Sequence, residues 1–350
     1  MIKNVAISGS GLQAETYIHY FKKKKYNIKG VKGSASERLQ YLNKTYGVMI
    51  YDTVDEMVKN EEVDLLVIAS RPSSHRDDVS AAIIGGIKYL IIEKPLAITI
   101  DQAVQIKKLI EDNNVNSSVA YPFRFQKTYM LIKEAIESKR FGDLKYIYGN
   151  ISFPRQINIS MPPFNWWIDK KISGGGSIFQ VGIHWINFIF GLAGYDYELY
   201  KGSLWENEYK IDDTLSGIWK SKCGDKYIEL FMTSCLPTEF LSVSFCFEEE
   251  EILYNNSSLH IISKNTKLKC LKNPIYLLER LIGRRNHITQ IKIPVRDKPL
   301  MDSYLDITLN ELTKKNYREF LDESVNDIKI IHSLAGLSRS CVFPNDRYQL

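Results

Sequence analysis

Short apolar runs alternate with helical patterns over the first 120 residues, and this alternation constrains the fold more than any other feature. The apolar runs predict buried strands, and the segments of about ten residues between them have helical periodicity. The predicted strands are 5–7, 29–31, 65–69, 89–92 and 117–120, and the predicted helices are 12–24, 36–46, 77–85 and 99–113. Strands that alternate with helices form a parallel sheet with right-handed crossovers. We therefore predict an α/β, doubly wound domain with a parallel sheet over residues 1–121.

The character of the sequence changes after Tyr121. A helical pattern precedes runs rich in Tyr, Ile and Phe with partial alternation, which is typical of an antiparallel sheet with one covered face. The helical pattern spans 127–138, and the runs are 145–152, 214–219, 227–233 and 240–247. A last helical pattern covers 316–339. We predict a second, α+β domain over residues 122–350.

The amino-acid composition limits the classes of protein to which this chain can belong. The hydrophobic content of 44% and charged content of 25% are those of a globular chain. The net charge of +5 is small for 350 residues and the lysines are scattered, so we expect no nucleic-acid partner. The one lysine run, 22–25, is interpreted as a solvated helix end rather than a polyanion patch.

Cysteine usage and hydropathy suggest a cytoplasmic protein. The five cysteines are odd in number and lack CxxC or zinc-type spacing, which indicates reduced thiols and no metal site. The N-terminus has no signal-peptide pattern. The apolar stretch near 183–194 contains His184 and Asn187 and is too short to cross a bilayer, so we expect no membrane partner.

A glycine-rich turn follows the first predicted strand. Its residues are Gly9, Ser10, Gly11, Leu12, Gln13 and Ala14. In a strand-to-helix turn, the first glycine permits the tight bend, the second lets a pyrophosphate approach, and the alanine lets helix and strand pack closely. A chance Gly-Ser-Gly loop that binds nothing is the alternative. The strand before the turn and the helix after it favour a dinucleotide.

The next turn bears on the choice of dinucleotide. An NAD site places an acid about 20 residues after the glycines, where it accepts the ribose 2′-hydroxyl. Gly33 occupies that place, while Lys32, Ser34 and Arg38 offer donors suited to a 2′-phosphate. We therefore favour NADP over NAD, although Lys32 and Arg38 could also be ordinary surface charges.

Two further segments carry groups that can move a proton. Glu93-Lys94-Pro95 ends the strand 89–92, at the edge of a parallel sheet where ligands collect. A buried lysine with a lowered pKa can exchange a proton with a hydroxyl or carbonyl oxygen while a hydride moves. This predicts Lys94 as the acid/base.

The second segment is a glycine run followed by a helix. Gly174-Gly175-Gly176 permits close backbone approach, as a cofactor or substrate would require. Helical spacing then places Gln180, His184 and Asn187 on one face. His184 could equally be a hydrogen-bonded core residue, because its neighbours are apolar.

In their order along about half of the chain, these segments resemble the Gfo/Idh/MocA family of oxidoreductases (glucose-fructose oxidoreductase / inositol dehydrogenase). Intermediate segments agree with that resemblance. They are 69–75, similar to the family's alanine-threonine-proline stretch ending in histidine, 121–125, similar to its arginine-phenylalanine segment, and the pair Trp166-Trp167 before the glycine run.

The resemblance implies a Rossmann domain followed by an α/β domain with an open, mostly antiparallel sheet that often mediates oligomerisation, here in a homodimer or homotetramer. It implies Lys94 and His184 as catalytic residues. The implied cofactor-binding set is Gly9, Ser10, Gly11, Leu12, Gln13, Lys32, Ser34, Arg38, Ser70, Arg71, Pro72, His75, Glu93 and Lys94, and the implied substrate-binding set is Lys94, Arg124, Trp167, Gln180 and His184.

The family's activity would be hydride transfer between NAD(P) and a secondary alcohol or ketone of a sugar or nucleotide sugar. Two positions depart from the pattern, since Gln180 stands where the family often has an aspartate and Asn187 stands where it has the following acid. A glutamine can orient a hydroxyl group but cannot take a proton. A cofactor-binding regulatory or scaffold protein without turnover therefore stays open, as does an NADPH-dependent imine or carbonyl reductase.

Overall fold

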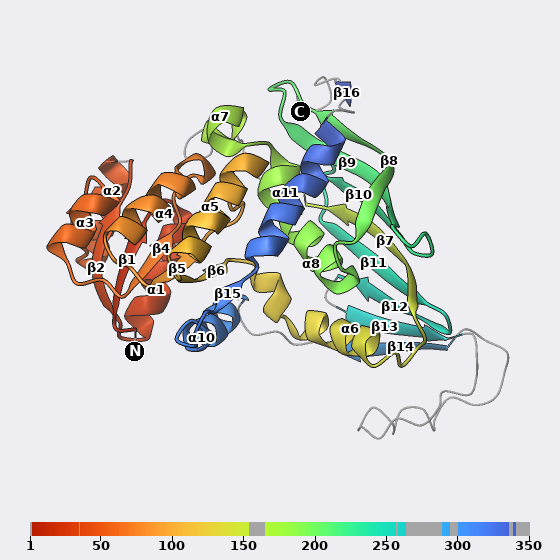
Figure 1. Ribbon diagram of the computed structural model, residues 1–350. Coiled ribbons are helices and arrows are strands. Elements are labelled where there is room, and N and C mark those ends of the chain that lie inside the picture. The colour runs from red at the N-terminus through yellow and green to blue at the C-terminus, as the bar shows by residue number, and fades with distance from the viewer. Residues whose placement is uncertain are drawn as a thin grey trace.

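The computed structural model describes residues 2–34, 36–153, 165–256, 258–263, 289–294, 300–335 and 339–340. Two sheets form the two halves of the molecule, and helices lie between them and around the first (Figure 1). The predicted fold class is confirmed, because one sheet is parallel and the other is mixed and mostly antiparallel.

The first sheet has seven strands in the order β15-β6-β5-β4-β1-β2-β3, and all of its pairings are parallel. The strands are β1 (Asn4–Ser8), β2 (Asn27–Lys32), β3 (Ile50–Tyr51), β4 (Leu65–Ile68), β5 (Tyr89–Ile92), β6 (Asn116–Val119) and β15 (Arg318–Glu319). Their helices are α1 (Leu12–Lys23), α2 (Ser36–Tyr46), α3 (Val54–Asn60), η1 (Pro72–Ser74), α4 (His75–Ile84) and α5 (Ile100–Asp112).

Alternate strand residues face opposite layers of helices, as the two-residue period of a strand requires. Val5 and Ile7 of β1 pack in the cluster that holds α1 and α2, whereas Ala6 packs with α3, α4 and α5. Both faces of the sheet are therefore covered, which explains why its strands read as continuous apolar runs.

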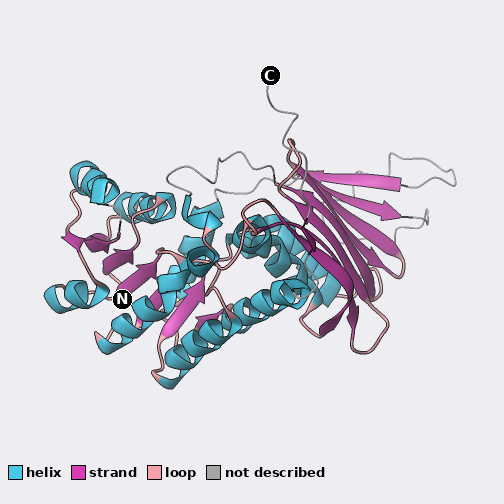
Figure 2. Ribbon diagram, turned by 90° about the horizontal axis from the view of Figure 1, so that it is seen from above, coloured by secondary structure: helices cyan, strands magenta, loops and turns pink. Residues whose placement is uncertain are grey.

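The second sheet has nine strands in the order β14-β13-β12-β11-β7-β10-β9-β8-β16. They are β7 (Leu144–Ser152), β8 (Tyr197–Glu206), β9 (Asp212–Ser221), β10 (Tyr227–Thr233), β11 (Phe240–Phe247), β12 (Glu250–Asn255), β13 (Ser258–Ser263), β14 (Thr289–Pro294) and β16 (Arg339–Ser340). Only β7·β10 and β8·β16 pair in parallel. Figure 2 shows helices on one face of this sheet and, among the described residues, none on the other.

Those helices connect the two halves. They are η2 (Pro122–Phe125), α6 (Lys127–Glu137), η3 (Asn165–Ile168), α7 (Lys170–Ser173), the π-helical turn η4 (Ile178–Gly182), α8 (Ile183–Ala193) and α11 (Leu321–Ala335). The helix α10 (Leu300–Glu311) instead packs in the apolar cluster of α1 and α2. One continuous apolar cluster includes residues of α4 and α5 from the first half and the inner face of the second sheet. The helix α11 contacts α5, α8 and β8, so it bridges the two halves.

The chain returns to the first half near its end. Lys23 of α1 and Lys24, which follows the helix, form ion pairs with Asp302 and Asp306 of α10. The Tyr20 hydroxyl also donates to Asp306 at 2.8 Å. The lysine run thus attaches α10 to α1, and β15 then pairs with β6. The sequence pattern over 316–339 predicts only a helix and misses this return.

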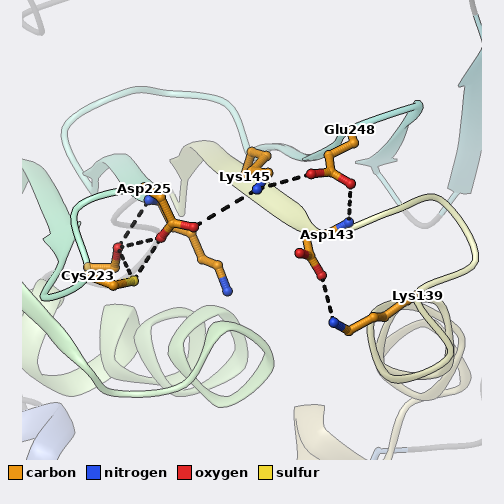
Figure 3. A network of polar contacts seen from close by, with 8 residues as sticks. Lys139, Asp143, Lys145, Cys223, Asp225 and Glu248 are labelled. Carbon is orange, nitrogen blue, oxygen red and sulfur yellow. Dashed lines mark hydrogen bonds and ion pairs between the residues drawn. The ribbon is translucent and has the colours of Figure 1, made fainter.

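A network of exposed charges ties three turns of the second sheet together (Figure 3). Lys145 Nζ lies 3.1 Å from Glu248 Oε1 and 4.0 Å from Asp225 Oδ2, while the backbone N–H of Asp143 donates to Glu248 and Lys139 pairs with Asp143. Exposed pairs like these contribute little individually to stability, because water and salt screen their charges.

Three cysteines lie in the described residues and are free: Cys223, Cys235 and Cys246. Cys270 and Cys341 lie outside the described residues. Within the described part of the chain, no group of three metal-ligating side chains gathers.

One helical run in the described residues, 170–193, is long and apolar enough to cross a membrane by length and composition alone. This run is longer than the apolar stretch near 183–194 that the sequence pattern indicates. However, 72% of its most apolar window is buried inside the protein, as expected for the core helix of the second half.

Candidate active site

The glycine turn between β1 and α1 has the geometry of an anion site. Gly9 has φ +133°, and a Cβ there would lie 2.3 Å from the Ala69 carbonyl oxygen, so the turn needs glycine to pass beside the end of β4. Gly11 is the N-cap of α1 and provides no capping side chain, and the space beside it is open. The first N–H groups of α1 therefore face an open space, which fits a pyrophosphate.

The residues after β2 lie beside this turn. A Cβ on Gly33 would lie 2.6 Å from Ser10 Oγ, so the end of β2 packs directly on the turn. Ser34 is exposed. Lys32 pairs with Asp78 at 3.0 Å, and Arg38 pairs with Glu15. Both predicted phosphate ligands are thus paired with acids.

The loop after β4 is tied to the loop after β5. His75 is buried, and its Nδ1 and Nε2 lie 3.1 Å from the carbonyl oxygens of Leu96 and Ser70. Burial lowers the pKa of His75, although the two carbonyl groups and Asp78 oppose this. The Ser70 hydroxyl donates to Asp78, and Pro72 is buried at the start of η1. These contacts make His75 a link between the loop after β4 and the loop after β5.

Glu93 connects α1 to the lysine. Its Oε1 accepts a hydrogen bond from the buried Tyr17 hydroxyl at 2.8 Å, and its Oε2 accepts one from the backbone N–H of Lys94 at 3.3 Å. Burial raises the pKa of Glu93, and the nearby Lys94 charge and the Tyr17 bond oppose that rise. The carboxyl group thus fixes the peptide that carries the Lys94 side chain.

Lys94 lies between the two halves of the protein. Its Nζ donates to the backbone carbonyl of Gln180 at 2.7 Å. Gln180 belongs to the π-helical turn η4, and such turns are frequent at functional sites because they alter the regular pairing of backbone carbonyls. Burial lowers the pKa of Lys94, and the Glu93 charge opposes this. The lowered pKa means that this lysine releases its proton more readily than an exposed lysine does.

His184 follows one turn later. Its ring stacks on Phe123 with centroids 4.9 Å apart and meets Tyr121 edge-on at 6.0 Å. Its Nδ1 is enclosed without a hydrogen-bond partner. Burial, and then the Lys94 charge, lower the pKa of His184 well below its usual value, so the imidazole is neutral. The structure therefore brings Lys94 and His184 together.

The Gln180 side chain has a structural partner. It is buried, and its Nε2 donates to the Ser173 carbonyl at 2.5 Å, which holds the end of α7 against η4. An aspartate at this position could not donate that bond. Trp167 lies half-buried in η3, and Arg71 lies over the ring of its neighbour Trp166 at 5.9 Å.

Protein atoms, rather than an open space, meet the glycine run. Gly174 has φ +78°, and a Cβ there would lie 2.9 Å from Ile98 Cα, in the loop after Lys94. A Cβ on Gly176 would lie 2.1 Å from the Asp212 carbonyl oxygen. The Asp212 carboxylate accepts from the N–H groups of Gly176 and Phe179 at 2.6 and 2.8 Å. The run therefore lets β9 and the Lys94 loop approach the start of η4.

Asn187 lies in a buried polar cluster behind the site. Its Nδ2 donates to Asp327 of α11 at 2.8 Å, and the Tyr195 hydroxyl donates to the same carboxyl group at 2.7 Å. Arg124 lies with this cluster, with its guanidinium over the rings of Tyr129 and Phe320 at 4.7 and 4.8 Å.

The Arg124 guanidinium also lies against Gly191 of α8, seven residues beyond His184. At 1.5 Å per residue this is about 10 Å along the helix. The role of Arg124 in substrate binding stays a prediction. In the structure, the contacts of Arg124 pack it against α8.

Four residues of the site are absent from the sequence-based set: Tyr17, Asp78, Asp212 and Asp327. Asp78 lies one helical turn after His75, and Tyr17 lies one turn after Ala14, so helical spacing could have indicated both. Asp212 and Asp327 approach the site through tertiary contacts alone, and no local pattern marks them.

Two family models match the chain. Residues 3–121 match the oxidoreductase family with an NAD-binding Rossmann fold, and residues 129–226 match the GFO/IDH/MocA C-terminal domain.

Two relatives have similar sequences. Glucose-6-phosphate 3-dehydrogenase of Bacillus subtilis is 22% identical over 288 residues, which cover 78% of this chain and 80% of the relative. Oxidoreductase P35 of Formosa agariphila is 29% identical over 170 residues, 48% of this chain, and the match spans 53% of that relative's length.

Solved structures share the fold. A 3-ketoreductase of Actinomadura kijaniata, KijD10, in complex with NADP and TDP-benzene, has a TM-score of 0.76 at 13% identity and covers 98% of this chain and 100% of its own. A UDP-N-acetylglucosamine 3-dehydrogenase of Acidithiobacillus ferrooxidans has a TM-score of 0.75 at 12% identity, with 97% and 98% covered.

Replacing Gly176 by alanine should destabilise the protein by about 2 kcal/mol or more, because the new methyl group would overlap the Asp212 backbone. Gly182→Ala is the matched control, since it has helical φ of −58° and its nearest contact would be 3.4 Å away. Alanine there should be neutral or stabilising. Urea denaturation measures both, and equal losses in the two variants would contradict this role of the glycine run.

Asp327 should make stability depend on pH. Burial raises its pKa to about 7, against the hydrogen bonds from Asn187 and Tyr195, the nearby Tyr121 and the charge of Arg124. The folded state therefore holds a proton that the unfolded chain releases near pH 4, and the free energy of unfolding falls as pH rises from about 4 to about 7.

Asp327→Asn should flatten this decline in urea denaturation across the same range. The exposed Asp322→Asn on α11 is the control. A decline as steep in Asp327→Asn as in the wild type would assign the pH dependence to other groups.

Proposed function

The chain belongs to the GFO/IDH/MocA family of NAD(P)-binding oxidoreductases, and from this we propose that it transfers a hydride between a nicotinamide dinucleotide and a secondary alcohol or ketone of a sugar or nucleotide sugar. The observation that carries the proposal is the contact of Lys94 Nζ with the Gln180 carbonyl, beside the neutral His184. This contact supports the proposal because it holds the Lys94 amino group where the two halves of the chain meet, near the end of β5.

The dinucleotide fits the residues present. The open N-terminus of α1, with Gly9, Ser10, Gly11, Leu12 and Gln13, would hold the pyrophosphate through backbone N–H groups. Ser70, Arg71, Pro72 and Glu93 would form the wall toward the nicotinamide, at the carboxyl ends of β4 and β5. When bound, the nicotinamide supplies or accepts the hydride.

Lys94 would balance the hydride with a proton. In ketone reduction its ammonium group donates a proton to the substrate oxygen, and in alcohol oxidation the neutral amine accepts the hydroxyl proton. The lowered pKa favours access to both states. One N–H of the ammonium group is held by the Gln180 carbonyl, which cannot accept a proton, so the remaining donors are available to substrate.

His184 would orient the same oxygen. Its neutral ring can donate or accept a hydrogen bond, and the stacked Phe123 and edge-on Tyr121 fix its plane. Gln180 would act through its backbone carbonyl and by holding Ser173, which makes an acidic side chain at this position unnecessary for placing Lys94.

Three relatives or structural neighbours support a sugar substrate. They are named glucose-6-phosphate 3-dehydrogenase, 3-ketoreductase and UDP-N-acetylglucosamine 3-dehydrogenase. We propose the same class of group here, a secondary hydroxyl or ketone on a pyranose ring, with Trp167 as an aromatic wall.

We also propose a homodimer or homotetramer that uses the uncovered face of the second sheet. Tyr148 of β7 and Phe240 of β11 are both exposed on that face, since register pairs Tyr148 with Ser244. Large exposed aromatic groups on an uncovered sheet are typical of an interface between proteins.

Lys94→Ala should lower kcat by about 10²–10⁴-fold and leave dinucleotide binding intact, because it removes the proton partner but not the anion site. Assays would follow the absorbance of the reduced nicotinamide with a panel of hexoses, hexose phosphates and nucleotide sugars. These would be supplied as alcohols to test oxidation, or as 3-ketones to test reduction. The control is Lys88→Ala, an exposed lysine just before β5. A variant that keeps its rate would contradict the role of Lys94, and tight binding without turnover by the wild type would support a regulatory protein instead.

A further inference from the structure

Two acids neutralise the two cations that flank the ribose end of the proposed dinucleotide site. We propose that Glu15 and Asp78 are coenzyme-specificity residues, which hold Arg38 and Lys32 away from a 2′-phosphate and so weaken NADPH relative to NADH. The inference rests on the proposed function, because it concerns the same dinucleotide site.

The position of the ribose end follows from the sheet. In doubly wound folds the residue after the second strand contacts the 2′-substituent, through an acid for a hydroxyl or through a nearby arginine for a phosphate. Here that residue is Gly33, whose Cα packs on Ser10 and which offers no acid. Discrimination between NADH and NADPH must therefore come from the residues near Gly33. Lys32 and Arg38 are the cations among them.

Arg38 is held from three sides. Its Nη2 forms an ion pair with Glu15 Oε2, its Nε donates to the Ser10 carbonyl at 3.2 Å, and its guanidinium lies 4.7 Å from the centre of the Tyr41 ring. A bidentate grip on a phosphate would require the guanidinium to leave this arrangement or to share it with a carboxylate.

Glu15 is itself held in place. Its Oε1 accepts hydrogen bonds from the hydroxyl groups of Tyr41 and Tyr46, each at 3.0 Å. Burial pushes its pKa upward, but the bonds from Tyr46, Arg38 and Tyr41 outweigh this and keep the pKa below its usual value. Glu15 is therefore an anion at neutral pH, next to the place where a second anion would have to bind.

Lys32 is paired in the same way on the other side of β2. Its Nζ lies 3.0 Å from Asp78 Oδ1, and Asp78 Oδ2 accepts from the hydroxyl groups of Ser8 and Ser70, each at 2.7 Å. Asp78 is buried, so its carboxylate cannot turn away to release the lysine. The two acids offset the charges of the two cations, so a phosphate dianion gains less attraction here than it would from unpaired cations.

The test measures the Kd of NADPH and of NADH for the full-length protein from nicotinamide fluorescence. In Glu15→Gln, which frees Arg38, the ratio of NADPH to NADH affinity should rise about fivefold or more, and in Asp78→Asn, which frees Lys32, by a similar factor. Adding Arg38→Ala to Glu15→Gln should abolish the gain.

The matched control is Glu37→Gln, an exposed acid next to Arg38 on the same helix. It changes the net charge by the same amount without releasing the guanidinium, so its ratio should change by less than about twofold. A gain as large as that of Glu15→Gln would reveal a general charge effect and overturn the assignment.

The opposite sign is equally informative. If Glu15 instead positions Arg38 for a phosphate, Glu15→Gln lowers the relative affinity for NADPH, and the assignment is wrong. An unchanged ratio in both Glu15→Gln and Asp78→Asn overturns it while leaving the proposed function intact. A wild-type protein that binds neither dinucleotide would overturn the proposed function together with this inference.

Discussion

The hydrogen bond from Lys94 to the Gln180 carbonyl is the constraint on which the site depends, because it joins the first sheet to the π-helical turn of the second half. Each partner is fixed from behind. The Tyr17 hydroxyl and Glu93 hold the Lys94 peptide, while Asp212 binds the N–H groups at the start of η4. The proposed proton chemistry at Lys94 would thus be coupled to the packing of the two halves.

A second feature of the structure is that several of its charged side chains form ion pairs. Several lysines form ion pairs that the sequence does not predict. Lys23 and Lys24 pair with acids of α10, and Lys32 pairs with Asp78. Lys94 differs because its partner is a neutral carbonyl, and its neighbour Glu93 is turned to Tyr17 and the backbone. A lysine with a neutral partner keeps the lowered pKa that burial imposes, as an acid/base requires.

The sequence predicts the first sheet well because its strands are buried on both faces and so read as unbroken apolar runs between helices. It misses β3, which is two residues long, and the return of β15 and α10, since pairing across 200 residues leaves no local pattern. At the site, Lys94 and His184 follow from motif and spacing. The contact of Gln180 with Ser173 and that of the glycine run with Asp212 are tertiary contacts, which local sequence patterns do not reveal. For this reason the sequence suggests a ligand beside the glycine run, where the structure has protein atoms.

The central claim is that Lys94 exchanges a proton with the substrate oxygen as the hydride moves, and the pH dependence of kcat/KM for alcohol oxidation tests it most directly. The neutral amine is the active form in that direction, so kcat/KM should rise with pH and level off at the pKa of Lys94, below the usual value of about 10.4 for lysine. A profile that stays flat over this range, or that falls as pH rises, would contradict the account.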